Sequence, residues 1–263
     1  MKLDSYETVA LSIDDKIARV TLNRPEIHNA FNEVMIGELL EVFRKLKDDE
    51  KLRVVILTGE GKSFCAGADI HWMKKMRDYT YEENVEDALA LANLMYEMFS
   101  FPKPLVGRIN GAAIGGGTGL VSVCDIGIAA EDAKFSFSEV KIGLVPACIS
   151  PYIVERVGFS KANQLFLTGE RFDAHRALHF GLVDEVVPSG ILDSRVNTFT
   201  EQLISSGPEA LATAKKLLRD IPYMSLEEQK RYSAEVLAKL RISDEGQEGL
   251  AAFLEKRKPK WAE

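Results

Sequence analysis

Apolar and polar residues alternate along residues 6–22 in the way that half-buried strands do. Asp14 and Asp15 interrupt this alternation, so the segment is predicted to form a hairpin. Further on, the apolar residues come in short runs that predict buried strands, at 54–58, 105–109, 125–130 and 182–187. Segments with helical periodicity lie between these runs. Strands that alternate with helices predict an α/β fold.

Two helices have recognisable starting signals. The first follows Asn29 and Asn32, either of which can serve as its N-cap. Its apolar stripe consists of Phe31, Met35, Leu39, Val42 and Leu46. Thr80 and Glu83 form a capping box before the second helix. That helix is predicted to continue to about residue 99, where prolines follow.

The last third of the chain reads as helical. Asp173 is placed to cap a helix that Gly181 ends, and after about residue 190 the strand signals disappear. Ser225 and Glu228 form another capping box, and Asp244 opens the last predicted helix. The pattern therefore predicts a body over residues 1–190 and a helical C-terminal region over residues 191–263.

The composition limits the classes of partner that the chain can have. A net charge of −7 argues against a general affinity for nucleic acid or anionic membranes. No apolar run approaches the roughly 20 residues that span a bilayer, and the N-terminus has no signal-peptide pattern, so we expect a cytoplasmic protein. Cys65, Cys124 and Cys148 are odd in number and scattered, which is typical of free thiols in a reducing compartment. His175 and His179 share a helix face, but no HExxH pattern or carboxylate spacing supports a metal site.

Two glycine-rich segments are the candidate chemistry. We call residues 64–70 the first glycine loop and residues 110–120 the second glycine loop; each joins an apolar strand-like run to a helix-like run. Small residues let a backbone approach a ligand closely, and N–H groups at a helix start point outward. Two such donors on one carbonyl oxygen would stabilise the enolate-like charge of a reacting thioester. A dinucleotide fingerprint is the competing interpretation, but the glycine spacing is wrong and no ribose-binding acid follows about 20 residues later.

Glu139 is the candidate acid or base. It lies among apolar residues, which are Phe135, Phe137, Val140, Ile142 and Leu144. Burial disfavours the charged form of a carboxyl group and would raise its pKa toward a value that suits proton transfer. From the residues alone, a surface glutamate at a strand end stays open as the alternative.

Taken together, the motifs resemble those of the enoyl-CoA hydratase/isomerase (crotonase) superfamily over nearly the whole chain. The matching segments occur in the family's order, and they lie at 23–32, 54–70, 103–120, 124–146, 166–187 and 252–261. The resemblance implies an α/β fold built as a spiral of repeated ββα units. It also implies a C-terminal helical region that packs subunits into a homotrimer or a dimer of trimers.

The resemblance also implies roles for single residues. The backbone N–H groups of Ala68 and Gly116 match the family's oxyanion-hole donors, and Glu139 matches its proton-transferring glutamate. The acyl-CoA thioester is then the partner, and no cofactor is expected beyond the coenzyme A of the substrate. The remaining matches concern coenzyme A binding: the backbone at Ala66, Asp69 and Ile70 grips adenine and pantetheine, and Phe253 and Lys256 reach a neighbouring subunit's coenzyme A.

The chain departs from the best-known hydratases of the family in one respect. Those enzymes carry a second glutamate three residues after the oxyanion glycine, where this chain has Gly119. The hydratases that act on 3-methylglutaconyl-CoA resemble this chain in that glycine, so we hypothesise that Gly119 leaves room for a β-methyl group. Ala147 replaces a glycine whose N–H holds the reacting water in many relatives, and we expect its N–H to keep that role.

Other interpretations remain open at this point. The family's Δ3,Δ2-enoyl-CoA isomerases also keep only the glutamate that matches Glu139, so isomerisation is the nearest alternative to hydration. Some relatives bind RNA, and the basic segment 256–260 could contribute to such a role. The cations that could bind a distal carboxylate of the substrate are Lys74, Lys75, Arg77 and Arg156.

Overall fold

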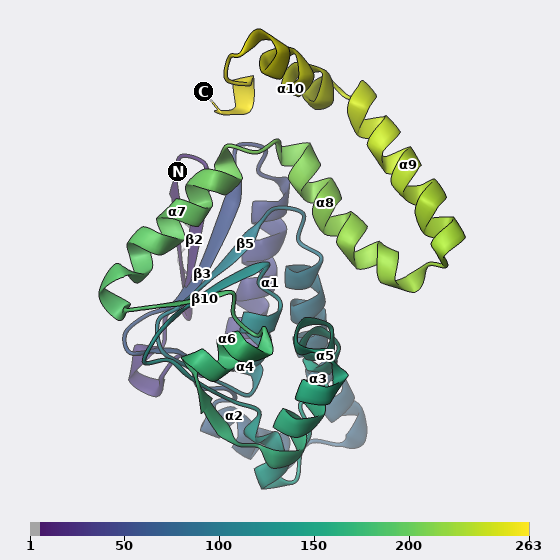
Figure 1. The fold of residues 1–263 in the computed structure, drawn as a ribbon. Coiled ribbons are helices and arrows are strands. Elements are labelled where there is room, and N and C mark those ends of the chain that lie inside the picture. Colours follow the sequence, from purple (N-terminus) through teal and green to yellow (C-terminus); the bar gives the residue numbers. More distant parts are fainter. Residues whose placement is uncertain (1–5, 263) are drawn as a thin grey trace.

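The computed structural model describes residues 6–262, and two sheets organise its body (Figure 1). The larger sheet has the strand order β1-β2-β3-β5-β7-β10. Its strands are β1 (Val9–Asp14), β2 (Ile17–Leu22), β3 (Val54–Gly59), β5 (Leu105–Ile109), β7 (Ile126–Ala130) and β10 (Glu185–Val187). β1 and β2 form the predicted antiparallel hairpin, and every later neighbour pairs in parallel.

The smaller sheet has the order β4-β6-β8-β9. Its strands are β4 (Ser63–Cys65), β6 (Ala112–Ile114), β8 (Lys134–Ser136) and β9 (Arg171–Asp173). β4, β6 and β8 are parallel, whereas β9 is antiparallel to β8. These three-residue strands are too short to show a period, so the sequence pattern does not predict them. They matter for the site, because β4 opens the first glycine loop and β6 lies within the second glycine loop.

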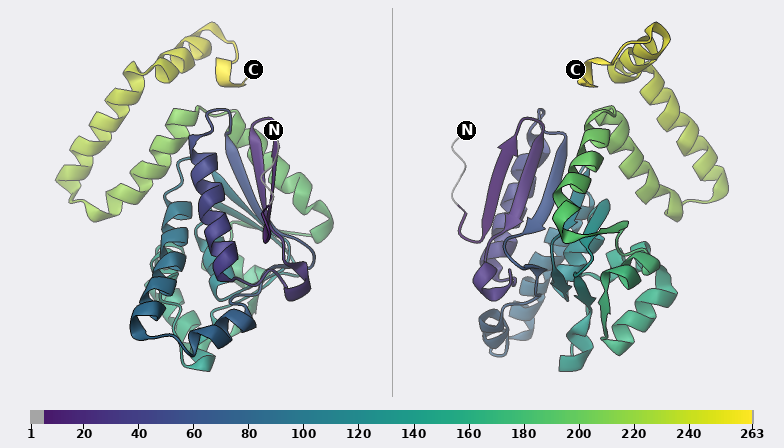
Figure 2. Two further views of the ribbon diagram at one scale, coloured as in Figure 1. Left: turned by 180° about the vertical axis from the view of Figure 1, so that it is seen from behind. Right: turned by 60° about the vertical axis from the view of Figure 1, so that its left-hand side comes forward.

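Within residues 6–262, ten α-helices surround and extend the sheets (Figures 1 and 2). They are α1 (Glu33–Asp48), α2 (Ile70–Met76), α3 (Tyr81–Phe99), α4 (Gly116–Ser122), α5 (Ser150–Thr168), α6 (Ala174–Phe180), α7 (Leu192–Ile204), α8 (Pro208–Asp220), α9 (Leu226–Ile242) and α10 (Asp244–Glu255). The short 3₁₀ helices are η1 (Pro25–Ile27), η2 (Ser138–Ile142), η3 (Ser189–Ile191), η4 (Ile221–Tyr223) and η5 (Lys260–Ala262). None of the helices described is both long and apolar enough to cross a membrane. The architecture is a mixed α/β fold followed by helices, as predicted.

The two faces of the larger sheet are covered by different helices. α1 and α3 pack against each other, and the side chains of α1 join the main core with alternate residues of β3 such as Val55 and Leu57. The intervening residues Val54 and Ile56 join a second apolar cluster that includes Leu192 and Val196 of α7. Alternate residues of this buried strand therefore pack on opposite faces of the sheet, which explains why residues 54–57 are continuously apolar.

The predicted helix signals are largely confirmed. Thr80 with Glu83 and Ser225 with Glu228 form reciprocal capping boxes at the starts of α3 and α9. Of the two candidates for the first cap, the structure selects Asn32, whose side chain accepts a hydrogen bond from Met35 N–H at 2.9 Å. The last helix starts at Asp244, as predicted, although the cap is the preceding serine.

The C-terminal helices α8, α9 and α10 form an arm (Figures 1 and 2). α8 lies along the body, where Lys215 pairs with Asp125 and Arg219 donates to the carbonyl oxygen of Phe99, whereas α9 and α10 project beyond it. None of the residues of α8 or α9 is buried. Large apolar side chains lie exposed along the arm, and they include Leu218, Leu226, Leu237, Ile242, Leu250, Phe253 and Leu254. The boundary near residue 190 stays a prediction, because α7 at the start of the helical region packs on the sheet.

Candidate active site

The first glycine loop is fixed by the segment before α1. Phe31 N–H donates to the carbonyl oxygen of Gly67 at 2.7 Å, and Asp69 N–H donates to the carbonyl oxygen of Phe31 at 2.7 Å. This is a parallel bridge between Phe31 and Ala68. Such a bridge uses the groups on either side of Ala68, so the N–H of Ala68 itself points away from Phe31. Ala68 is exposed while Gly67 and Asp69 are buried, which leaves this amide open to a ligand.

The second glycine loop turns sharply into α4. Gly115 adopts a φ of +53° and donates its N–H to the carbonyl oxygen of Ser136 at 2.8 Å. Gly116 is the first residue of α4, so its N–H has no acceptor within the helix. Gly116 is partly exposed, whereas Gly115 and Gly117 are buried. The second loop therefore also presents one free amide between buried neighbours.

The two loops lie against each other. A Cβ atom built on Gly117 would stand 2.9 Å from the Cβ of Cys65, and one built on Gly67 would stand 3.0 Å from the carbonyl oxygen of Ile114. These separations are too short for a real side chain. The glycines are therefore needed because the first and second loops touch, and the close approach expected from the sequence is present.

Glu139 lies on η2 directly beside the second glycine loop. One carboxylate oxygen, Oε1, is 2.9 Å from where a Cβ on Gly115 would be. The other, Oε2, is buried and has no hydrogen-bond partner among the described residues. A carboxylate in this state is poised to accept a proton, since its second oxygen is not held by the protein.

Burial raises the pKa of Glu139 above its ordinary value, and a backbone hydrogen bond only partly opposes this effect. The direction agrees with the prediction, but part of the expected cause is wrong. Phe135 and Phe137 are fully buried, whereas Ile142 and Leu144 are exposed. The exposed residues that follow Glu139 therefore do not shield its carboxyl group, whereas the second glycine loop lies directly against it at Gly115.

Comparison with known proteins accounts for this arrangement. The family model named enoyl-CoA hydratase/isomerase matches residues 12–263. The chain belongs to the enoyl-CoA hydratase/isomerase family. A relative from Thermus thermophilus is 37% identical over 245 residues, which are 93% of this chain and 97% of the relative. A crystal structure of an enoyl-CoA hydratase from Shewanella pealeana is 40% identical with a TM-score of 0.95, over 97% of this chain and 96% of that one.

A second solved structure supports the same assignment. The enoyl-CoA hydratase of Mycobacterium smegmatis is 30% identical with a TM-score of 0.91, and the match covers 98% of this chain and all of that one. The chain is therefore an enzyme of the enoyl-CoA hydratase type, with the crotonase fold that the sequence predicts.

In this family member, the residues of the first glycine loop that are expected to bind coenzyme A line one cavity. Its volume is about 390 Å³, and its walls include Ala66, Ala68, Asp69 and Ile70. Lys74 lies on the same wall and gives the cavity a positive charge. The cavity thus joins the first oxyanion candidate to the segment expected to hold the nucleotide end of the substrate.

The carboxylate of Asp69 faces the protein rather than the ligand. It pairs with Arg24 at 2.8 Å and accepts a hydrogen bond from His71 N–H at 2.6 Å at the start of α2. Burial acts to raise the pKa of Asp69, but these bonds outweigh it and lower the pKa. Asp69 therefore secures the shape of the first glycine loop. Its backbone is engaged as well, since its N–H donates to Phe31 and its carbonyl oxygen accepts a hydrogen bond from Met73 N–H at 2.9 Å.

The expected space at Gly119 is filled. A Cβ atom on Gly119 would lie 2.9 Å from the Cβ of Ile149 and closer still to its Cγ2. Ile149 is 2% exposed and precedes α5, thirty residues further along the chain. The hypothesis that Gly119 leaves room for a β-methyl group is therefore wrong, because an aliphatic side chain occupies the place next to it.

Ala147 also differs from the expectation. Its N–H donates to the carbonyl oxygen of Val145 at 2.8 Å. The residue is exposed, but the amide that was expected to hold the reacting water is already engaged in a tight turn.

Phe253 and Lys256 are not brought to the site of their own chain. Both are exposed, at the end of α10, at the opposite end of the molecule from α2 (Figure 1). Within one chain they contribute nothing to the cavity beside the first glycine loop. Their expected contact with coenzyme A requires a neighbouring subunit.

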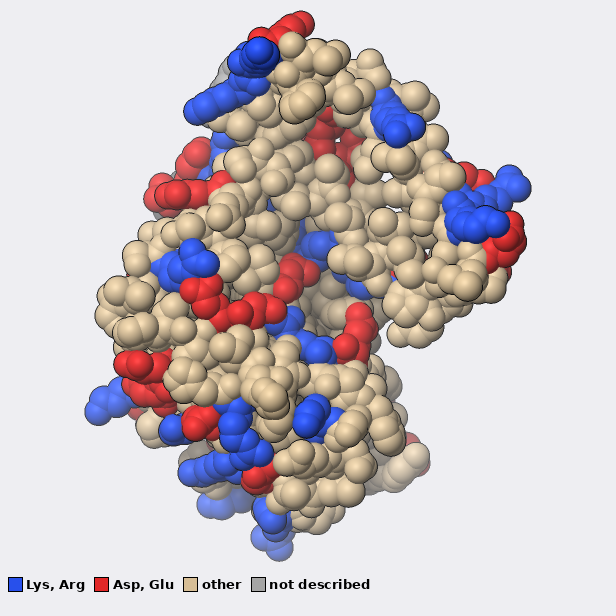
Figure 3. Space-filling view, in the orientation of Figure 1, with Lys and Arg blue, Asp and Glu red and all other residues tan. Residues whose placement is uncertain are grey.

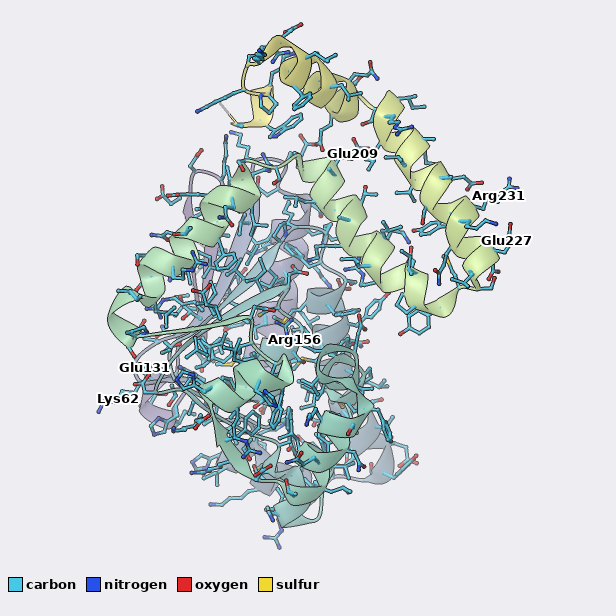
Figure 4. All side chains as sticks on the ribbon, viewed as in Figure 1. Lys62, Glu131, Arg156, Glu209, Glu227 and Arg231 are labelled. Carbon is cyan, nitrogen blue, oxygen red and sulfur yellow. The ribbon has the colours of Figure 1, made fainter. Side chains whose placement is uncertain are left out.

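The four candidate cations fall into different environments. Lys74 faces the cavity, and Arg77 is exposed at the end of α2. Lys75 pairs with Glu33 at the surface. Arg156, labelled in Figure 4, pairs with Asp184 and donates to the carbonyl oxygen of Leu182 at 2.7 Å. Arg156 is therefore committed to holding α5 to the strand β10 region and is unsuited to bind a substrate carboxylate.

Two residues at the site were not singled out from the sequence. Phe31 was assigned to the apolar stripe of α1, although it lies just before the N-cap and reaches both glycine loops. Ile149 had no signal at all, because only the folded chain brings it against Gly119.

Proposed function

We propose that this enzyme adds water across the 2,3 double bond of an enoyl-CoA thioester. The observation that supports this most is the contact between two loops that each present one free amide, at Ala68 and Gly116, with the partnerless carboxylate oxygen of Glu139 alongside. In this proposal the thioester oxygen accepts hydrogen bonds from both amides. That polarisation withdraws electrons from the double bond and makes Cβ electrophilic.

Glu139 then performs the proton transfers. Its carboxylate takes a proton from water while the water oxygen bonds to Cβ, and the resulting enolate is held by the two amides. Glu139 returns the proton to Cα, so the sum of the steps is the addition of one water. The substrate itself carries the coenzyme A, and we propose that no other cofactor takes part.

The test is Glu139→Gln. The variant is expected to bind enoyl-CoA esters with near-normal affinity and to lose turnover by about 10²–10⁴-fold, the contribution typical of a general base. Loss of enoyl absorbance and gain of one water in the product mass would be followed together. Full activity of the variant would remove Glu139 from the mechanism.

Isomerisation between Δ3 and Δ2 enoyl esters is the second candidate. It is favoured by the single carboxylate, by Ile149 packed at Gly119, and by the occupied amide of Ala147. The product mass separates the two reactions, because an isomerase leaves the mass unchanged. The RNA-binding alternative has less support: in the basic segment, Arg257 is paired with Glu248, and positive and negative side chains are interspersed on the face in Figure 3.

For the acyl group we propose a chain branched at C3, such as 3-methylglutaconyl-CoA. The support is the resemblance of residues 64–73, 115–126 and 143–154 to hydratases of that substrate. Since Ile149 fills the space at Gly119, the methyl group must lie elsewhere in the site. Turnover of 3-methyl-branched and unbranched enoyl esters should be compared, and a strong preference for the unbranched ester would contradict the proposal.

We further propose that the chain works as a homotrimer or a dimer of trimers in the cytoplasm. The exposed apolar side chains of the arm need a covering surface, and the three cysteines are free, as in a reducing compartment. Light scattering would give the mass of the assembly. A monomer at micromolar concentration would overturn the proposal for assembly.

A further inference from the structure

We infer that Phe31 is a positioning residue that sets the separation between the two oxyanion amides. The inference rests on the proposed function, because it concerns how the amides of Ala68 and Gly116 are held on one oxygen atom. Phe31 is 1% exposed, so it can act only through the groups that it touches.

The backbone of Phe31 holds the first amide. Its N–H and carbonyl oxygen bond to Gly67 and Asp69, the residues that flank Ala68. Both bonds are 2.7 Å long, at the short end of the normal range for N–H to oxygen. The direction of the Ala68 amide is therefore fixed relative to Phe31.

The ring of Phe31 supports the second amide. A Cβ atom built on Gly116 would lie 3.2 Å from Cε2 and 3.3 Å from Cδ2 of the ring, and, apart from Gly115, Gly117 and the backbone of α4, no other described atom would come within 4 Å of it. The ring edge thus lies directly against the α-carbon of Gly116. The other contacts between the loops join Cys65 with Gly117 and Gly67 with Ile114, which are neighbours of the donors rather than the donors themselves.

Phe31 is in turn anchored to the body. Asn29, two residues before Phe31, is fully buried and adopts a left-handed φ of +57°. Its side chain donates to the carbonyl oxygens of Glu60 and Ser63 at 2.9 and 2.8 Å and accepts from Arg24 N–H at 2.9 Å. The residue that follows Phe31 caps α1. Phe31 therefore belongs to a segment that hydrogen bonds hold in place, and from this segment it contacts both glycine loops.

Shortening this side chain should spoil the oxyanion geometry without removing any group that contacts the substrate. A displacement of about 1 Å is enough to reduce a rate by about 10²-fold. We expect Phe31→Leu to lower kcat by about 10- to 100-fold and to change KM little. Phe31→Met, whose longer flexible side chain can still reach Gly116, should recover most of the activity.

The control is Phe43→Leu. Phe43 is equally buried in α1 and packs edge-on against Phe101 with ring centroids 5.3 Å apart, and it is not among the nearest neighbours of any glycine in the two glycine loops. The Phe43→Leu variant should lose about as much stability as Phe31→Leu, because the same atoms are removed from a packed core. Its kcat should stay close to that of the unmodified enzyme.

The decisive readout is the thioester carbonyl stretch of a ¹³C-labelled enoyl-CoA, measured by infrared difference spectroscopy. Glu139→Gln would be present throughout, so that the ester stays unreacted. The band should move to lower frequency in the Glu139→Gln protein and in its combination with Phe43→Leu, and much of this shift should be lost with Phe31→Leu. An equal shift and an equal kcat for the Phe31 and Phe43 variants would overturn the inference while leaving the proposed function intact. If the unmodified enzyme does not hydrate the ester and the Glu139→Gln protein shows no shift of the carbonyl band, the inference and the proposed function are both overturned.

Discussion

Filling Gly119 should destabilise the enzyme, even though alanine is the better helix former. A Cβ atom there would lie 2.9 Å from the Cβ of Ile149, in a site with no exposed surface. Overpacking a core in this way costs about 1–3 kcal/mol. Helix propensity returns only about 1 kcal/mol for glycine to alanine. Gly119→Ala should therefore lower the free energy of unfolding by up to about 2 kcal/mol.

Gly37 provides the matched control. It lies in α1, and a Cβ atom built on it meets nothing within 4 Å. Gly37→Ala should stabilise the protein by about 0.5–1 kcal/mol. The two variants thus make the same chemical change in a helix with opposite expected signs.

The clash can also be assigned to its partner by a double-mutant cycle. Ile149→Ala alone should cost about 2–5 kcal/mol, because it leaves a cavity. Combined with Gly119→Ala, the added methyl group would occupy part of that cavity, so the two effects should be less than additive by about 1–3 kcal/mol. The free energies would come from urea unfolding at one fixed protein concentration. Additive effects, or a stabilising Gly119→Ala, would refute the view that Ile149 fills the place beside Gly119.

Three further outcomes are expected. Because burial raises the pKa of Glu139 in the folded enzyme, the charged carboxylate destabilises the fold. At neutral pH the Glu139→Gln variant should therefore have a higher melting temperature than the unmodified enzyme. This difference should disappear as the pH falls below the ordinary pKa of glutamate, because the carboxyl group is then protonated in both the folded and the unfolded chain. A difference that grows toward acid pH would contradict this. Arg24→Met should lower the free energy of unfolding by about 3 kcal/mol, because it removes the ion-pair partner of the buried Asp69 carboxylate. It should also weaken the binding of enoyl-CoA esters in a titration. Unchanged binding would contradict the role of the Arg24–Asp69 pair in shaping the first glycine loop. Burial raises the pKa of Cys65 and of Cys124 to about 12. At pH 8 a thiol reagent should therefore label only Cys148 in the folded protein. Labelling of more than one thiol per chain would contradict the structure.

Local signals in the sequence were sufficient for most elements of the fold. The capping boxes at Thr80 and Ser225 predicted the starts of α3 and α9, because a cap involves residues only three positions apart. The same logic could not choose between Asn29 and Asn32. Asn29 is instead committed to hydrogen bonds with Arg24, Glu60 and Ser63, and two of these lie more than thirty residues away.

The active site was predictable in part. The glycines of both loops indicated a close approach, and the burial of Glu139 could be inferred from the phenylalanines before it. The errors concern contacts that no local pattern encodes. The space beside Gly119 is taken by a side chain thirty positions later, and the amide of Ala147 is turned back onto Val145.

The proposed mechanism requires one thioester oxygen to lie between the amides of Ala68 and Gly116. A crystal structure of the Glu139→Gln enzyme with an unreacted enoyl-CoA ester would show whether it does. The thioester oxygen should lie about 2.7–3.1 Å from both amide nitrogens, the range for oxyanion donors. An ester bound in the cavity with its carbonyl oxygen bonded to only one of the two amides, or to neither, would contradict the claim.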